Sequence, residues 1–81
     1  MDREEITRIV TDELADIIKI DKSKITPTSS LIDDLDISSL EILVLIGNLE
    51  AKTGVSISQE DTADIETVSD IVDKIMGRKQ A

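Results

Sequence analysis

The sequence contains no cysteine, no histidine and no aromatic residue. Without cysteine the chain has no disulfide, no thiolate nucleophile and no cysteine-based metal site. Without histidine it lacks the commonest general base and metal ligand at neutral pH, so we expect neither a catalytic centre nor a metal site. The missing aromatic rings remove any platform for stacking bases, and the net charge of −9 argues against nucleic acid as a partner.

The sequence is also short and has no long hydrophobic run. No apolar run approaches the roughly 18 residues that a membrane span needs, and no signal peptide is recognisable. We therefore expect a cytoplasmic chain without a membrane span. A length of 81 residues predicts a single domain over 1–81, acting as a monomer. Such a domain buries only about 60–65% of its unfolded surface, which leaves a small core and no deep active-site cleft.

What the sequence does contain is helical periodicity. Apolar residues recur at helical spacing in three segments, which predicts principal helices over 2–20, 39–53 and 67–77. Ser58 is expected to cap a further, short helix. A glycine ends the last predicted helix, and residues 77–81 are expected to form a frayed tail.

The segment between the first two predicted helices, residues 21–38, is long for so small a domain. Long ordered loops are uncommon and are often functional. We expect this one to be ordered, because apolar residues recur along it and can pin it to the core: Ile25, Leu31, Ile32, Leu35 and Ile37. The predicted fold class is all-α, a small four-helix bundle of three principal helices and one short helix, with a long ordered loop between helices one and two.

The helix predicted over 39–53 has two apolar stripes. The first is assigned to the core and comprises Ile42, Leu45, Ile46 and Leu49. The second runs beside it and comprises Leu40, Leu43, Val44 and Gly47. Two interpretations of the second stripe stay open. Either the helix is buried on two sides within the bundle, or this stripe meets a partner or a ligand.

Two adjacent serines stand where the loop meets this helix. Ser38 and Glu41 fit the capping box S-x-x-E, so we expect the Ser38 hydroxyl to cap the helix. Ser39 then falls at the first helical position, beside the positive end of the helix dipole, an environment that suits a phosphate. A nucleophilic serine needs an adjacent base, and Lys52 lies at the far end of the helix. Ser39 is therefore either an ordinary exposed residue or the acceptor of a modification.

Most of the net charge lies in the middle of the chain. Residues 29–66 carry nine acidic residues against Lys52 alone, a net charge of −8. One interpretation is a solvated surface that aids solubility. The other is a docking face for partners with basic patches. The serine pair lies inside this segment, which favours the docking face.

Residues 35–41 read Leu-Asp-Ile-Ser-Ser-Leu-Glu, and the segments ITPTSSLIDDL, LEAKTGVSIS and DIETVSDIVDKI lie around them. In order, spacing and total length, this arrangement resembles the acyl carrier protein family almost from end to end. The family signature around its attachment serine is roughly Leu-Gly-x-Asp-Ser-Leu-Asp/Glu. The serine of that signature matches Ser39.

The resemblance implies a carrier protein rather than an enzyme. A phosphopantetheinyl transferase would attach 4′-phosphopantetheine from coenzyme A to Ser39, and the thiol of that arm would hold acyl groups as thioesters for fatty-acid or related lipid or polyketide biosynthesis. Acyl-transferring and synthase enzymes would dock basic patches beside Ser39. The residues expected in this docking surface are Asp33, Asp34, Asp36, Leu40, Glu41, Val44, Gly47 and Glu50.

The chain departs from the family pattern at several of these positions. Ser38 stands in place of the usual Asp, Asp36 in place of the usual Gly, and Val44 where the family often has Glu. These departures favour a specialised carrier at least as much as one that serves the main fatty-acid synthase. Two alternatives stay open beside the acyl carrier: an aminoacyl or peptidyl carrier, and an unmodified acidic helical adaptor.

Overall fold

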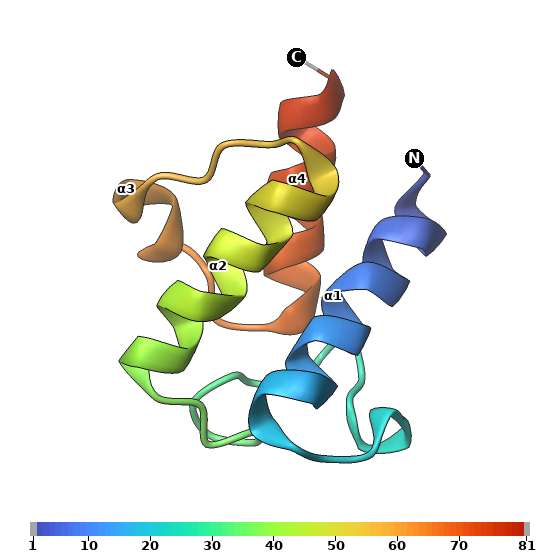
Figure 1. Cartoon of the computed structure of the whole chain (residues 1–81), viewed down its shortest axis with the longest axis vertical. Helices are drawn as coiled ribbons and strands as arrows, with labels where there is room; N and C mark the ends of the chain where they lie inside the picture. Colours follow the sequence, from blue (N-terminus) through green and yellow to red (C-terminus); the bar gives the residue numbers. More distant parts are fainter. Residues whose placement is uncertain (1, 81) are drawn as a thin grey trace.

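The computed structural model describes residues 2–80, with side chains from 2 to 78, as helices joined by loops (Figure 1). The elements are α1 (Arg3–Ile18), the 3₁₀ turn η1 (Lys22–Lys24), α2 (Ser39–Thr53), α3 (Gln59–Thr62) and α4 (Val68–Gln80). The three long helices form the body of the molecule, and the short α3 lies at its side, next to α2 (Figure 1). This arrangement confirms the predicted all-α bundle. None of the helices within 2–80 has the length and apolar character needed to cross a membrane.

Capping side chains precede three of the helices, and two of these caps, Ser38 and Ser58, were predicted. The side chains of Asp2, Ser38 and Ser58 each accept a hydrogen bond from the backbone N–H three residues further on, at 2.9, 3.2 and 3.2 Å. These bonds satisfy N–H groups that the first turn of a helix leaves unpaired. The end of α2 also lies where it was expected, because Gly54 adopts the left-handed conformation with φ 73°.

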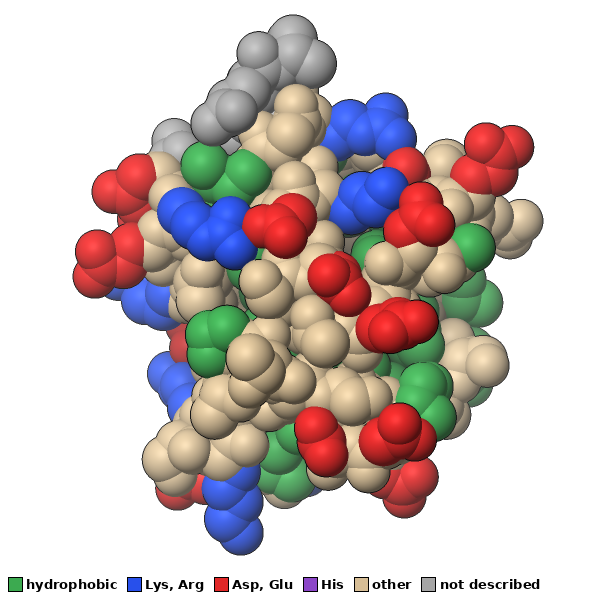
Figure 2. All heavy atoms as spheres, turned by 180° about the vertical axis from the view of Figure 1, so that it is seen from behind, with side chains coloured by type: hydrophobic (Ala, Val, Ile, Leu, Met, Phe, Trp, Pro, Cys, Tyr) green, Lys and Arg blue, Asp and Glu red, His purple; other side chains and the backbone are tan. Residues whose placement is uncertain are grey.

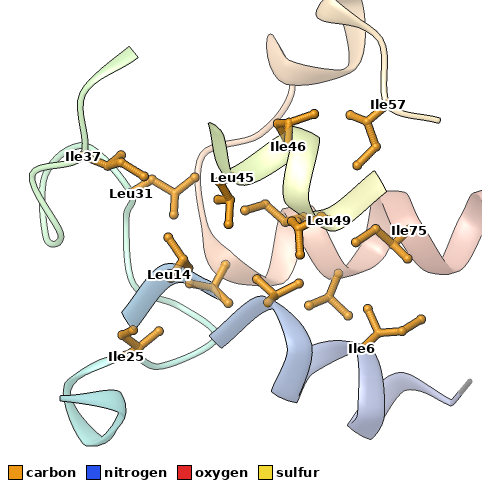
Figure 3. Packing of buried hydrophobic residues seen from close by; sticks show 14 of the residues in the cluster. Ile6, Leu14, Ile25, Leu31, Ile37, Leu45, Ile46, Leu49, Ile57 and Ile75 are labelled. Carbon is orange, nitrogen blue, oxygen red and sulfur yellow. The ribbon is translucent and has the colours of Figure 1, made fainter. Parts of the chain in front are cut away.

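The core is built from branched aliphatic side chains of all three long helices. Within the described residues, every buried hydrophobic residue is Ile, Leu or Val. Leu45 and Leu49 of α2 are fully buried and point toward Leu14 of α1 and Ile75 of α4 (Figure 3). Burial of this kind stabilises a fold by roughly 1.5–3 kcal/mol for each such side chain. The apolar packing therefore fixes α2 against α1, which also packs against α4.

The loop before α2 is ordered, as expected. The N–H of Leu31 donates to the carbonyl of Glu66 at 2.9 Å, and the N–H of Val68 donates to the carbonyl of Ser29 at 3.2 Å. These bonds tie the loop to the start of α4. Leu31 is also buried, and so is Ile37, just ahead of α2. The loop thus delivers the chain to the start of α2 in one conformation.

Two details of this loop differ from the sequence prediction. Ile32 was expected to pin the loop to the core, but its side chain is 57% exposed. It follows the buried Leu31 within a turn, so the two neighbouring side chains point in different directions. In addition, Lys22–Lys24 form one turn of 3₁₀ helix, capped by the Asp21 carboxylate, where no helix was expected.

The last helix is longer than predicted. Gly77 was expected to end it and to begin a frayed tail, but α4 continues through Gly77 to Gln80. The residues that follow Gly77 are Arg, Lys and Gln, which all favour helix, and the guanidinium of Arg78 is bonded to the carboxylate of Asp61. These contributions offset the cost of a glycine in a helix. Ala81 lies outside the described residues.

Candidate functional site

The site predicted from the sequence lies at the first turn of α2. Ser38 precedes the helix with an extended backbone, and its hydroxyl accepts the N–H of Glu41 at 3.2 Å. In return, the Glu41 carboxylate accepts the N–H of Ser38 at 2.8 Å. The predicted capping box is therefore present, and the hydroxyl of Ser38 is engaged in holding the helix.

Ser39 is the first residue of α2, and its side chain is exposed. Within the described residues its hydroxyl has no hydrogen-bond partner. It lies at the helix end where unpaired N–H groups and the macrodipole favour a negative group. The surroundings of Ser39 therefore fit a phosphodiester attached through its hydroxyl oxygen.

The turn that precedes the serine pair is fixed by local bonds. The N–H of Ser30 donates to the Asp34 carboxylate at 2.7 Å, and the N–H of Ile37 donates to the carbonyl of Leu31 at 2.9 Å. Asp36 adopts a left-handed backbone with φ 53°. Only glycine takes up this conformation freely, and Asp or Asn tolerate it better than most residues. The chain thus retains a tight turn where the family signature has glycine.

The acidic residues predicted for the docking surface fall into two groups. The carboxylates of Asp34, Glu41 and Glu50 are bonded to backbone N–H groups of this chain; that of Glu50 accepts the N–H of Ile57 at 2.7 Å and fixes the loop before α3. Asp33 and Asp36 are exposed, and their side chains have no hydrogen-bond partner within the described part of the chain. These two carboxylates are the ones with all their oxygens open to a partner.

The acidic residues of this region are balanced even less than its net charge implies, because its single base is already paired with a carboxylate of α1. Lys52, the single base among residues 29–66, pairs with Glu13 of α1 at 2.5 Å, and Asn48 also donates to that carboxylate. The hydrogen bond to Glu13 raises the pKa of Lys52 above its ordinary value. Seen from behind, acidic side chains gather on the half of the molecule that holds α3 (Figure 2).

The second stripe of α2 lies in solvent. Leu40, Leu43 and Val44 are 70, 57 and 46% exposed, and a Cβ built on Gly47 would meet nothing within 4 Å. The interpretation in which α2 is buried on two sides is therefore wrong. We call Leu40, Leu43, Val44 and Gly47 the exposed stripe. Exposed apolar side chains gathered on one helix face are typical of an interaction surface.

A shallow pocket of ≈ 260 Å³ opens directly beside Ser39. We call it the Ser39 groove, and its lining residues are Ser39, Ile42, Leu43 and Thr62. Three of these come from α2, and Thr62 comes from α3. The sequence gave no signal for Thr62, because its proximity to Ser39 depends on how α3 folds back. The groove places apolar side chains within reach of a chain attached at Ser39.

Within residues 2–80, no group of three or more acidic side chains is arranged to hold a metal ion. With no histidine or cysteine in the sequence, the site also lacks a group that could activate the Ser39 hydroxyl. A capped, exposed serine at the start of a helix, beside an apolar groove and acidic residues, is the arrangement expected of a serine that another protein modifies.

Comparison with known proteins agrees with this expectation. The family model for the phosphopantetheine attachment site matches residues 8–75. The chain is 37% identical to the acyl carrier protein of Rubrobacter xylanophilus over the full length of both, and 40% identical to the meromycolate extension acyl carrier protein of Mycobacterium tuberculosis over 70 residues, which is 61% of that protein. The solved structure of the Enterococcus faecalis acyl carrier protein superposes with a TM-score of 0.81 at 32% identity, covering 96% of this chain and 99% of that one.

The chain belongs to the acyl carrier protein family. It is thus a carrier protein and a substrate of phosphopantetheinylation, not an enzyme, and its cofactor is 4′-phosphopantetheine. Its relatives are acyl carriers, which favours acyl cargo over the aminoacyl and adaptor alternatives and fits a role in fatty-acid or related lipid metabolism.

Proposed function

We propose that Ser39 is the attachment serine. This proposal rests on the difference between the two adjacent serines. The Ser38 hydroxyl caps α2, while the Ser39 hydroxyl is exposed and has no hydrogen-bond partner within the described residues. When bound, 4′-phosphopantetheine supplies a terminal thiol that holds an acyl group as a thioester. The helix N-terminus stabilises the negative phosphodiester, and the transferase must supply the base.

Ser39→Ala and Ser38→Ala are the paired variants that test this proposal. Each is incubated with coenzyme A and a broad-specificity phosphopantetheinyl transferase, and the intact mass is measured. We expect wild type and Ser38→Ala to gain the mass of one arm and Ser39→Ala to gain none. Far-ultraviolet circular dichroism checks that both variants are folded. A modified peptide that carries its group on Ser38 would overturn the assignment.

We further propose that partner enzymes dock on the acidic surface around Ser39. Its acidic members are Asp33, Asp34, Asp36, Glu41 and Glu50, and its apolar members are the exposed stripe. Because three of these carboxylates already hold backbone N–H groups, Asp33 and Asp36 should contribute most to attraction of a basic patch. Such attraction is screened by salt, with a Debye length of about 8 Å at physiological ionic strength.

The salt dependence of transferase binding tests this docking surface. Affinity for the transferase should fall as salt rises, and Asp33→Asn should weaken binding at low salt and flatten the dependence. Glu5→Gln, an exposed carboxylate on the first turn of α1, removes the same charge away from Ser39 and serves as the control. Equal effects of the two variants would show that only net charge matters, and an affinity independent of salt would refute the electrostatic footprint.

We propose that the exposed stripe selects the synthase. Val44 offers an apolar contact where the family often has Glu. Gly47 costs α2 about 1 kcal/mol relative to Ala, although among the described residues a Cβ at this position would meet nothing within 4 Å. The variant Val44→Glu with Gly47→Met moves α2 toward the family pattern. A general fatty-acid transacylase should load it better than wild type. Equal loading of the two proteins would remove the case for a specialised carrier.

A further inference from the structure

The short helix α3 is held in a different way from the rest of the molecule. It has four residues, Gln59–Thr62, and a single turn of helix is not stable by itself. None of these four side chains belongs to the hydrophobic core; the buried Ile57 and the half-buried Ile65 flank them. Apolar packing therefore anchors the two ends of this segment but not the helical turn between them.

A set of charged residues supplies the missing anchor. Both oxygens of the Asp61 carboxylate accept hydrogen bonds from Nη2 of Arg78, at 2.7 and 2.6 Å. Lys74 lies one turn earlier on α4, and its Nζ is 3.2 Å from a carboxylate oxygen of Asp64 and 3.8 Å from one of Asp61. We call Asp61, Asp64, Lys74 and Arg78 the α3 latch.

Asp61 joins this latch to the helix itself. Its carboxylate also accepts the backbone N–H of Ser58 at 2.9 Å and the Ser58 hydroxyl at 3.0 Å, so one side chain both caps α3 and ties it to α4. The Asp61 side chain is only 11% exposed. Many exposed ion pairs contribute little to stability, but a shielded carboxylate with several donors is held more firmly.

The neighbour of Asp61 in the sequence is Thr62, which lines the Ser39 groove on the other side of α3. The two residues face different elements: Asp61 is bonded to α4, and Thr62 lies opposite Ile42 and Leu43 of α2. Figure 1 shows α3 beside α2 in this arrangement. Whatever holds Asp61 therefore also fixes the wall of the groove.

We propose that Arg78, assisted by Lys74, is a positioning residue that keeps α3 as the wall of the Ser39 groove, so that the last turn of α4 controls how readily an acyl chain enters. This inference rests on the proposed attachment at Ser39. Release of the Arg78–Asp61 bonds would leave Lys74 as the remaining polar link between α4 and this segment, and the groove would open more readily without disturbing the core of α1, α2 and α4.

Hydrogen exchange of the unmodified chain tests the latch without any cofactor. In Arg78→Gln, the amides of residues 58–64 should exchange roughly tenfold faster, as expected when a charge-assisted hydrogen bond is lost. Arg78→Lys should keep most of the protection. The control is Arg3→Gln, because Arg3 is about as exposed as Arg78 but pairs with Asp73 at 2.7 Å, away from α3. Exchange at 58–64 should not change in this variant.

The possible results separate the proposals. Unchanged exchange at 58–64 in Arg78→Gln would overturn the latch, and so would equal acceleration in the core of α1, because the residue would then act on the whole fold. With loaded protein, hydroxylamine should cleave a long-chain thioester more slowly than a short one in wild type, and this difference should shrink in Arg78→Gln. Failure of Ser39 to accept the arm would overturn the attachment site but leave the exchange result standing.

Discussion

The three long helices and the corner that contains α3 are held together by different forces. In the body of the molecule, α1, α2 and α4 share a core in which Leu45, Leu49 and Ile75 have no exposed surface. In the corner, one carboxylate, Asp61, receives bonds from its own cap and from Arg78. Close-packed side chains lose contacts with any displacement, whereas the hydrogen bonds of a partly shielded ion pair can be replaced by hydrogen bonds to water when the pair opens.

This difference separates the two tasks of a carrier. The attachment serine, which we propose is Ser39, needs a constant position if partner enzymes are to find it in the same place. Ser39 starts α2, whose fully buried Leu45 and Leu49 point into the shared core (Figure 3). In our proposal the groove beside it accepts and releases an acyl chain, and the wall that moves is Thr62, in the corner that polar contacts hold. A rigid attachment point and an adjustable wall thus meet at one site.

The largest loss of stability should come from a substitution in the apolar core of the three long helices. Leu45→Ala removes a fully buried side chain and should lower the free energy of unfolding by about 2–5 kcal/mol. Leu40→Ala on the same helix removes a side chain that is 70% exposed and should change it by no more than about 0.5 kcal/mol. Urea unfolding followed by circular dichroism measures both. Equal losses would mean that the exposed stripe takes part in the core.

The same substitution, serine to alanine at a helix cap, can be made in the body at Ser38 and in the corner at Ser58. Ser38→Ala should cost the whole fold about 1 kcal/mol, because α2 is part of the cooperative core. Ser58→Ala removes the equivalent cap of α3 and should leave the urea midpoint almost unchanged while hydrogen exchange at residues 59–64 speeds up. A large shift of the midpoint in Ser58→Ala would show that α3 unfolds together with the body.

A smaller change, and a gain in stability rather than a loss, is expected when glycine replaces a residue whose backbone is left-handed. Lys19 ends α1 with φ 58°, and Asp36 precedes the serine pair with φ 53°. Lys19→Gly should raise the free energy of unfolding by roughly 0.5–1 kcal/mol, because glycine adopts this conformation without strain. Asp36→Gly should give less, since aspartate tolerates the conformation better than lysine. Urea unfolding decides, and a loss of stability in Lys19→Gly would contradict the strain argument.

The smallest effect should be local, in the titration of Asp61. The backbone N–H of Ser58, followed by the Arg78 guanidinium, lowers the pKa of this carboxyl from its ordinary 3.8 to about 2. Because the folded-state pKa is depressed, the stabilisation of α3 is complete above the ordinary pKa and is lost as the pH falls from about 4 toward 2. Carboxyl-carbon chemical shifts should give this midpoint in wild type and a higher one in Arg78→Gln. An unchanged midpoint would exclude Arg78 as a cause.

Features that depend on neighbours in the sequence could be predicted well. The bounds Ser39–Thr53 of α2 match the prediction, because a capping serine, a helical apolar period and a terminal glycine act within a few residues of one another. The same holds for Ser58 and its short helix. The distinction between Ser38 and Ser39 follows from the same local rule, since only one of two adjacent serines can occupy the cap.

Features that depend on distant contacts could not be predicted. Arg78 was placed in a frayed tail, because nothing in the sequence indicates that α3 brings Asp61 to it. Glu50 was assigned to partner docking alone, although its carboxylate also holds the N–H of Ile57. Ile32 was assigned to the core because its side chain is apolar, but the course of the turn exposes it. In each case the tertiary arrangement decides which of several reasonable partners a side chain meets.

The aliphatic interior has a practical consequence for observing this chain at work. With no tryptophan, tyrosine or phenylalanine, the protein contributes essentially no near-ultraviolet absorption or intrinsic fluorescence. Any such signal in a mixture therefore belongs to the partner enzyme. Conversely, every buried hydrophobic residue described carries methyl groups of Ile, Leu or Val, so isotopic labelling of three amino acids would make the whole interior visible by nuclear magnetic resonance. The two partners of a complex could thus be followed separately in one sample.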